Sequence, residues 1–180
     1  MDKIKEYIEF LLKCNEKMNL IGSSTIADIE NRHIKDCLQI MKFIQNKDIK
    51  LADLGSGAGL PGILLSIMGV KEVHLFEKSA KKCDFLEKAK KFSNNKIVVQ
   101  NVNLYDYKDN TFDIITSRAL GSLNMLLELS KNLKKNDSEL IFLKGKKVYE
   151  EIEDAKTKHK FEYKLHDSET SEEGKIIIIN

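Results

Sequence analysis

The chain has 180 residues, of which 42% are hydrophobic and 32% are charged, and its net charge is +2. This composition is that of an ordinary globular protein and excludes the disordered and fibrous classes. The longest aliphatic run, residues 176–179, is too short to cross a membrane, and the charged start of the chain shows no secretory signal. The three cysteines have no C-x-x-C spacing, which indicates reduced thiols rather than a zinc site. We therefore expect a cytoplasmic protein with no metal site and no membrane partner.

The first 48 residues carry a helical pattern and form an expected N-terminal cap. Apolar residues from Ile4 to Leu12 recur at the i, i+3, i+4 spacing of one helix face, and this pattern stops near Asn19. A second helix is expected from Thr25 to Ile44. The predicted organisation is a cap over residues 1–48 and a core over residues 49–180, packed as one compact unit.

From residue 50 onward, short strands alternate with helices. Strands are expected at residues 50–54, 72–77, 96–101, 112–116, 138–143, 161–166 and 175–179, and helices at 60–68, 80–92, 122–133 and 148–158. Alternation of this kind predicts an α/β fold with a parallel, doubly wound sheet. The last two strands are separated only by a short acidic stretch, so they should pair as an antiparallel hairpin. Seven strands with the last one reversed resemble the Rossmann-like fold of class I methyltransferases.

The strongest local motif is the glycine-rich sequence DLGSGAGLPG at residues 53–62. It joins a strand to a helix, where glycines allow the backbone to approach a ligand and Glu77, at the end of the next strand, can accept ribose hydroxyls. This arrangement predicts a nucleoside cofactor. Residues 57–62 satisfy the G-x-G-x-x-G pattern of dinucleotide enzymes, but the motif equally suits S-adenosylmethionine enzymes. The reversed last strand favours S-adenosylmethionine.

Motifs that the sequence lacks narrow the range of possible methyl acceptors. A single proline excludes the N/D-P-P-Y/F pocket that is typical of enzymes methylating exocyclic amines. Methylation of pyrimidine C5 needs a cysteine nucleophile, but Cys14 and Cys37 lie in the cap and Cys83 in a lysine-rich helix. An acceptor with an in-plane lone pair, such as guanine N7, needs alignment and no general base.

Five motifs then carry a resemblance to a known family. The segments NEKMNL (15–20), RHIKD (32–36), DLGSGAGLPG (53–62), SRA (117–119) and LKG (143–145) occur in the order and spacing of the bacterial 16S rRNA guanine-N7 methyltransferases. The resemblance covers nearly the whole chain. It implies methyl transfer from S-adenosylmethionine to N7 of a guanine near the decoding centre, giving 7-methylguanosine.

The resemblance also implies a cofactor site. By position, Gly55 and Leu60 line the methionine and adenosine region, Asn103 and Leu104 bracket the adenine, and Arg118 reaches the cofactor or the acceptor pocket. Family members often have an acidic residue in place of Leu104, so this contact must come from the backbone here. The complete set of expected cofactor residues is Gly55, Gly57, Gly59, Leu60, Glu77, Asn103, Leu104 and Arg118.

Arginine is rare in this chain, and both arginines are therefore candidates for specific contacts. Of the 30 basic residues only Arg32 and Arg118 are arginines, the type preferred for planar or bidentate contacts. Arg118, His33 and Asp36 are candidates for positioning the acceptor, and no residue is expected to be an obligatory catalyst. For Arg32, His33 and Asp36, polar contacts between the cap and the core are equally compatible with the sequence. The candidates for binding RNA are Arg32, Lys81, Lys82, Lys144, Lys146 and Lys147.

The expected partner is 16S rRNA or a small ribosomal subunit particle, bound by a monomer. Two alternatives stay open at this stage. One is a small NAD(P)-dependent oxidoreductase, although the sequence lacks a Tyr-x-x-x-Lys proton donor. The other is a non-catalytic ribosome-associated protein that retains a cofactor fold, which would also account for the lysine clusters.

Overall fold

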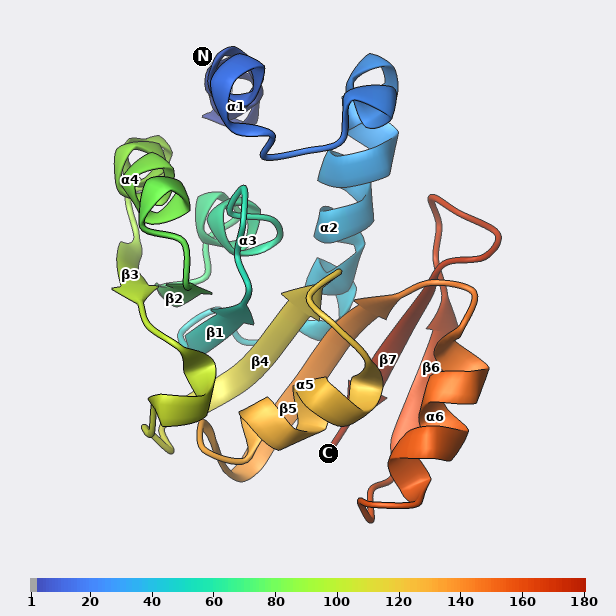
Figure 1. Cartoon of the computed structure of the whole chain (residues 1–180). Helices are drawn as coiled ribbons and strands as arrows, with labels where there is room; N and C mark the ends of the chain where they lie inside the picture. Colours follow the sequence, from blue (N-terminus) through green and yellow to red (C-terminus); the bar gives the residue numbers. More distant parts are fainter. Residues whose placement is uncertain (1–2) are drawn as a thin grey trace.

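A seven-stranded sheet forms the centre of the computed structural model, which describes residues 3–180, so residues 1–2 of the expected cap lie outside it (Figure 1). The strand order is β3-β2-β1-β4-β5-β7-β6. The strands are β1 (Lys50–Leu54), β2 (Glu72–Glu77), β3 (Lys96–Asn101), β4 (Phe112–Arg118), β5 (Lys134–Lys144), β6 (Tyr163–Asp167) and β7 (Lys175–Ile179). The helices are α1 (Lys3–Met18), α2 (Asp36–Leu38), α3 (Gly62–Ile67), α4 (Ala80–Ala89), α5 (Leu123–Ser130) and α6 (Val148–Lys156).

The strand directions confirm the predicted topology. Strands β1 to β5 pair in parallel, while β7 lies between β5 and β6 and is antiparallel to both. The order reverses between β1 and β4, and in open α/β sheets the ligand crevice lies beside this reversal at the carboxyl ends of the strands. The glycine-rich loop after β1 and Arg118 at the end of β4 both occupy this edge.

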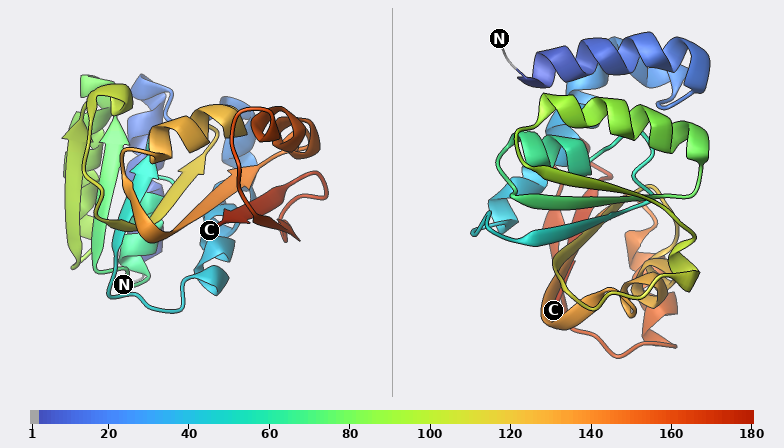
Figure 2. Two further views of the ribbon diagram at one scale, coloured as in Figure 1. Left: turned by 90° about the horizontal axis from the view of Figure 1, so that it is seen from below. Right: turned by 90° about the vertical axis from the view of Figure 1, so that its left-hand side faces the viewer.

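Helices cover both faces of the sheet, and each face has its own hydrophobic core. Along β1, Leu51 belongs to the core beneath α3, α4 and the N-terminal segment, whereas Ala52 and Leu54 belong to the core beneath α5 and α6. Figure 2 shows α1 lying outside α4, so the N-terminal segment adds an outer layer to one face only. None of the helices in residues 3–180 has the length and apolarity needed to cross a membrane.

The helix expected from Thr25 to Ile44 is present as a run of helical turns, but these turns do not form one regular α-helix. This segment consists of a 3₁₀-helix (Ser23–Asp28), a π-helix (Glu30–Lys35), the short α2 and a second 3₁₀-helix (Gln39–Phe43). Irregular turns of this kind often occur where tertiary contacts compete with the regular helix, and functional sites are common at π-helical turns. Here the carbonyl of Arg32, inside the π-helix, accepts a hydrogen bond from Arg118 at 3.1 Å.

Two strands are longer than predicted, which changes the place of two candidate residues. β4 continues to Arg118 rather than ending at Thr116, and β5 runs from Lys134 to Lys144 rather than over residues 138–143. Two further 3₁₀-helices, Lys90–Phe92 and Leu104–Asp106, follow α4 and β3. Arg118 and Lys144 are therefore the last residues of adjacent strands.

Candidate functional site

The glycine-rich loop has one face that is open to a ligand. Gly55, Gly57 and Gly59 have φ of 69°, 54° and 80°, which favours glycine at all three positions. A Cβ on Gly55 would lie 2.5 Å from Leu120 Cδ1, so that glycine also serves packing. Among the described residues, the atom nearest to a Cβ on Gly57 would be the Gly55 carbonyl oxygen at 3.7 Å. The Gly57 backbone therefore borders open space, as close approach by a cofactor requires.

Two carboxylates hold this loop in place. Glu77 is 8% exposed and accepts hydrogen bonds from the backbone N–H of Gly57 at 3.0 Å and of Ser79 at 2.9 Å. Each carboxylate oxygen can accept a second bond, so Glu77 keeps capacity for ribose hydroxyls. Asp53 is fully buried and accepts from the Gly62 N–H at 3.1 Å. Within residues 3–180 its Oδ1 atom has no hydrogen-bond partner, and burial raises the pKa of Asp53 to about 7.

Asn103 and Leu104 follow β3 at the same edge of the sheet. The Asn103 side chain accepts a hydrogen bond from the Tyr105 N–H at 3.3 Å and thereby begins a short 3₁₀-helix. The Leu104 side chain is buried in the core on the α5 and α6 side, so only its backbone can face a ligand. Leu60, in the glycine-rich loop, is also buried. These positions fit a cofactor whose adenine is recognised through backbone groups.

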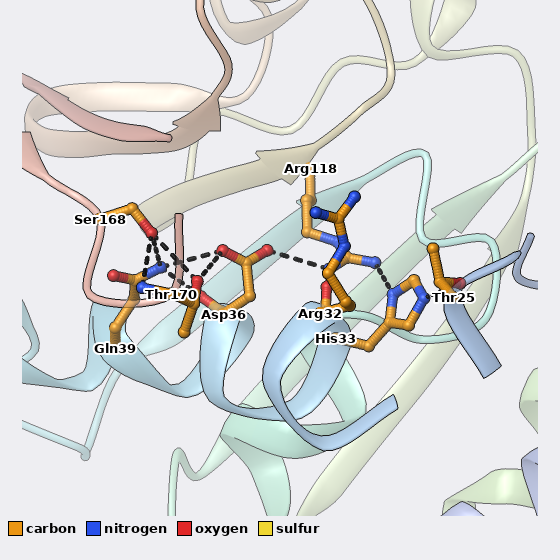
Figure 3. A network of polar contacts seen from close by, with 8 residues as sticks. All are labelled: Thr25, Arg32, His33, Asp36, Gln39, Arg118, Ser168 and Thr170. Carbon is orange, nitrogen blue, oxygen red and sulfur yellow. Dashed lines mark hydrogen bonds and ion pairs between the residues drawn. The ribbon is translucent and has the colours of Figure 1, made fainter. Parts of the chain in front are cut away.

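Arg118 is bound to the N-terminal segment by three acceptors (Figure 3). Its Nη1 donates to the Arg32 carbonyl at 3.1 Å and to Asp36 Oδ2 at 3.0 Å, and its Nη2 contacts His33 Nδ1 at 2.5 Å. The neighbouring strand register places Ser117 beside Leu54, directly before the glycine-rich loop. Arg118 therefore joins the cap to the edge of the sheet that carries the loop.

The protonation of His33 follows from its two neighbours. Thr25 donates its single hydroxyl hydrogen to the Gly22 carbonyl at 2.7 Å, so its oxygen must accept from His33 Nε2, also at 2.7 Å. The lone pair of Nδ1 is then free to accept from Arg118. Burial, and after it the Arg118 charge, lowers the pKa of His33 to about 4. The imidazole is thus neutral at physiological pH and acts as an acceptor for the guanidinium.

The loop of the β6–β7 hairpin completes the network from the far end of the chain. Asp36 Oδ1 accepts from Thr170 Oγ1 and from Gln39 Nε2, each at 3.0 Å, and Gln39 Oε1 accepts from the Glu169 N–H at 2.9 Å. Sequence reasoning missed Thr25, Gln39 and Thr170, because nothing in their local sequence signals contacts between segments so far apart.

A cavity of about 500 Å³ lies beside this network, within the range of small-molecule sites. The N-terminal segment, the ends of β4 and β5 and the β6–β7 loop all contribute to its wall. Its charged lining residues are Arg32, Asp36, Arg118, Lys144, Lys146, Glu173 and Lys175, and the neutral His33 also lines it. The predominance of cations in this wall suits an anionic substrate such as RNA.

The lysine candidates differ in how they are placed. Lys81, Lys146 and Lys147 are exposed, as is Arg32, and Lys82 is half-buried in the first turn of α4. The side chain of Lys144 is only 7% exposed, and its Nζ lies 2.6 Å from Glu151 Oε2 and 2.7 Å from the Gly121 carbonyl oxygen. Two of its three N–H donors are thereby taken inside the protein. The expected role of Lys144 in binding RNA phosphates does not fit this position.

The cysteines do not supply a nucleophile to the cavity wall. Cys37 is fully buried, and burial raises the pKa of its thiol to about 12. Burial also raises the pKa of Cys83, whose Sγ contacts the Glu77 carbonyl at 3.3 Å. Because the thiolate is the nucleophilic form, neither of these two groups is prepared for covalent attack at neutral pH.

Comparisons with known proteins agree with this geometry. The family model GidB, described as rRNA small subunit methyltransferase G, matches residues 1–176. The chain is 42% identical over 180 residues to the ribosomal RNA small subunit methyltransferase G of Rickettsia rickettsii (strain Sheila Smith), covering 100% of this chain and 93% of that protein. The protein of the same name from Rickettsia prowazekii (strain Madrid E) has the same identity and coverage.

Solved structures support the fold. Magnesium protoporphyrin IX methyltransferase from Synechocystis PCC 6803, with bound SAH, matches with a TM-score of 0.68 at 13% identity, covering 100% of both chains. The ribosomal protein L11 methylase from Lactobacillus delbrueckii subsp. bulgaricus has a TM-score of 0.66 at 20% identity, covering 83% of this chain and 78% of that one. Taken with the sheet order, the glycine-rich loop and the match over nearly the full length, these findings show that the chain belongs to the rRNA small subunit methyltransferase G family.

Proposed function

We propose that this protein transfers a methyl group from S-adenosylmethionine to N7 of one guanine in 16S rRNA. The family determines the reaction class, S-adenosylmethionine-dependent methylation of ribosomal RNA, and removes the nicotinamide alternative. The observation that carries the finer assignment is the basic cavity beside Arg118, which opens at the same sheet edge as the glycine-rich loop. We further propose that the protein acts as a monomer in the cytoplasm.

The residues at the loop suit the cofactor. In this proposal Gly57 offers the open backbone face, Glu77 accepts the ribose hydroxyls, and the backbone of Asn103 and Leu104 borders the adenine. Gly55, Gly59 and Leu60 shape the loop itself. The bound cofactor supplies a methyl group on a positively charged sulfur. A nucleophile attacks the methyl carbon in line and displaces the sulfur.

Catalysis in this proposal depends on position. Guanine N7 carries a lone pair in the ring plane at neutral pH, so the protein has no proton to remove and must align that atom with the methyl group. Arg118, fixed by His33 and Asp36, orients the base at the boundary between the loop and the cavity. The methylated ring gains a positive charge, which the Glu173 carboxylate in the cavity wall can partly offset, whereas Asp36 is already paired with Arg118.

RNA binding in this proposal uses the exposed cations around the cavity. Arg32 and Lys146 lie in its wall, and Lys147 follows directly. Lys81 and Lys82 begin α4 on the loop side of the sheet and extend the basic surface. Contacts of this kind bind phosphates and do not recognise the base sequence. The target guanine must therefore be recognised through the shape of the folded rRNA or of a ribosomal particle.

The test is transfer of labelled methyl groups to small subunits, and to naked 16S rRNA, from cells that lack this modification. One labelled 7-methylguanosine at a single position is the expected product, and the better substrate reveals what the enzyme recognises. Label on another atom or another RNA contradicts the proposed acceptor. Absence of transfer despite tight cofactor binding favours the non-catalytic alternative. Light scattering of the purified protein tests the monomer.

A further inference from the structure

The peptide group between Ala58 and Gly59 is held at both ends. Its N–H donates to the Ser56 carbonyl at 2.6 Å, inside the glycine-rich loop. Its carbonyl, on the buried Ala58, accepts a hydrogen bond from a donor outside the loop, the hydroxyl of Tyr7. Tyr7 lies in α1, 51 residues earlier in the chain. The loop therefore depends on the N-terminal helix for one of its hydrogen bonds.

Tyr7 is built into the core rather than placed on its surface. It is 0% exposed, and its ring packs edge-on against Phe92 with centroids 6.0 Å apart. Burial raises the pKa of its hydroxyl well above the ordinary value, so the group keeps its proton and remains a donor across the physiological range. A buried tyrosine usually directs its hydroxyl to a partner, and here that partner is the loop.

The position of this bond matters because glycines flank it. Gly57 and Gly59 both have positive φ, and glycine backbones rotate more freely than those of other residues. Without an anchor the intervening peptides can turn, and the Gly57 N–H would leave its bond to Glu77. An anchored Ala58 carbonyl fixes the orientation of Gly57, whose open face is where a ligand can approach.

We propose that Tyr7 is a positioning residue for the cofactor, acting through the Ala58 carbonyl without touching the cofactor itself. The N-terminal helix thereby becomes part of the cofactor site and not only a cover for α3 and α4. This inference rests on the proposed placement of S-adenosylmethionine at the glycine-rich loop. It predicts that removing a single oxygen atom in α1 weakens cofactor binding while the packing of the ring is retained.

The test compares Tyr7→Phe with wild type by calorimetric titration of S-adenosylmethionine and by steady-state kinetics on rRNA. The dissociation constant and KM for the cofactor should rise roughly fivefold to tenfold, as expected when a buried carbonyl loses its donor. The kcat at saturating cofactor should stay within about twofold, because the acceptor side is unchanged. Amide hydrogen exchange at Gly59 should accelerate in the variant without cofactor.

Ser130→Ala is the matched control. Its hydroxyl is also buried and also donates to a backbone carbonyl, that of Leu126 at 2.7 Å, but it lies in α5 away from the loop. This variant should lose stability and keep the wild-type KM for the cofactor. If Tyr7→Phe behaves like Ser130→Ala, Tyr7 is only a structural residue and the inference fails.

A third variant separates this inference from the placement on which it rests. Gly57→Ala adds a methyl group to the open face of the loop, 3.7 Å from the nearest described protein atom, and also strains the backbone at φ 54°, so thermal unfolding first checks that the variant is folded. If Gly57→Ala leaves cofactor affinity unchanged, the placement of the cofactor at the loop is wrong. If Gly57→Ala abolishes binding while Tyr7→Phe has no effect, the placement stands and the role of Tyr7 alone is refuted.

Discussion

Replacing Asp36 by asparagine tests whether the polar network serves Arg118. The carboxylate accepts from Arg118, Thr170 and Gln39, and the asparagine amide keeps one acceptor while directing N–H groups at a donor. The side chains of Arg118 and Asp36 are 17% and 23% exposed, so the pair is largely but not fully shielded from water. Hydrogen bonds to charged groups contribute about 1.5–3 kcal/mol when buried, and partial exposure suggests about 2 kcal/mol here.

This magnitude gives two measurable effects. In a chain of this size 1 kcal/mol corresponds to about 2–4 °C in Tm, so the Tm of Asp36→Asn should be about 4–8 °C below that of wild type. If all of the lost energy orients Arg118 in the transition state, kcat/KM for rRNA falls by at most about 30-fold. Thermal unfolding and methyl transfer at varied rRNA concentration measure the two effects on the same preparation.

Asp113→Asn supplies the control for this prediction. Asp113 also pairs with a cation, Lys135 at 2.5 Å, and accepts from the Lys50 N–H at 2.7 Å, but it lies near the opposite end of β4. This variant should unfold earlier with kcat/KM for rRNA unchanged. The reasoning is refuted if both variants lose activity equally, or if Asp36→Asn loses stability and no activity.

Two further predictions concern buried charges. The pKa of Asp53 is raised to about 7 from an ordinary 3.8, so between these two pH values the folded chain holds a proton that the unfolded chain has released. The free energy of unfolding should therefore fall as the pH rises from about 4 through 7. Asp53→Asn should flatten this part of a thermal-unfolding pH profile, and an unchanged slope contradicts the assignment. Lys144→Met should leave the Glu151 carboxylate with the Leu123 N–H but without its cation, and cost roughly 3 kcal/mol of stability while the salt dependence of rRNA binding stays the same. Lys146→Met should keep the stability and lower the slope of log affinity for rRNA against log salt concentration by about 0.7 to 0.9. Equal slopes in the two variants would contradict the assignment of Lys146, and not Lys144, to RNA binding.

The features that the sequence predicts well are those with a local cause. The strands at residues 50–54, 72–77, 96–101 and 175–179 were predicted with the bounds that the structure shows, because buried apolar runs between turn residues carry their own signal. The reversed last strand followed from linker length, since residues 167–174 leave no room for a crossover helix. The glycine-rich loop could also be predicted, because its signal lies in its own residues.

The features that the sequence does not reveal depend on distant partners. Arg118 was a candidate because arginine is scarce, but its bonds to Arg32, His33 and Asp36 join residues more than 80 positions apart. Lys144 was expected just beyond the fifth strand because the predicted strand ended one residue too early, at residue 143. Tyr7 matched the apolar face of a helix, and a hydroxyl that bonds another segment leaves no trace in that periodicity.

The position of β7 has a consequence for the order in which the molecule can assemble. β6 is synthesised first, yet its neighbour in the sheet is β7, which separates it from β5. Until β7 emerges from the ribosome, β5 lacks this neighbour and the loop carrying Thr170 has no fixed position beside Asp36. Strand pairing with an inserted partner is slow compared with local helix formation, and unpaired edges attract other chains. The wall of the cavity is thus completed only when this strand is in place, so a nascent chain that has already folded its glycine-rich loop still lacks one side of the cavity.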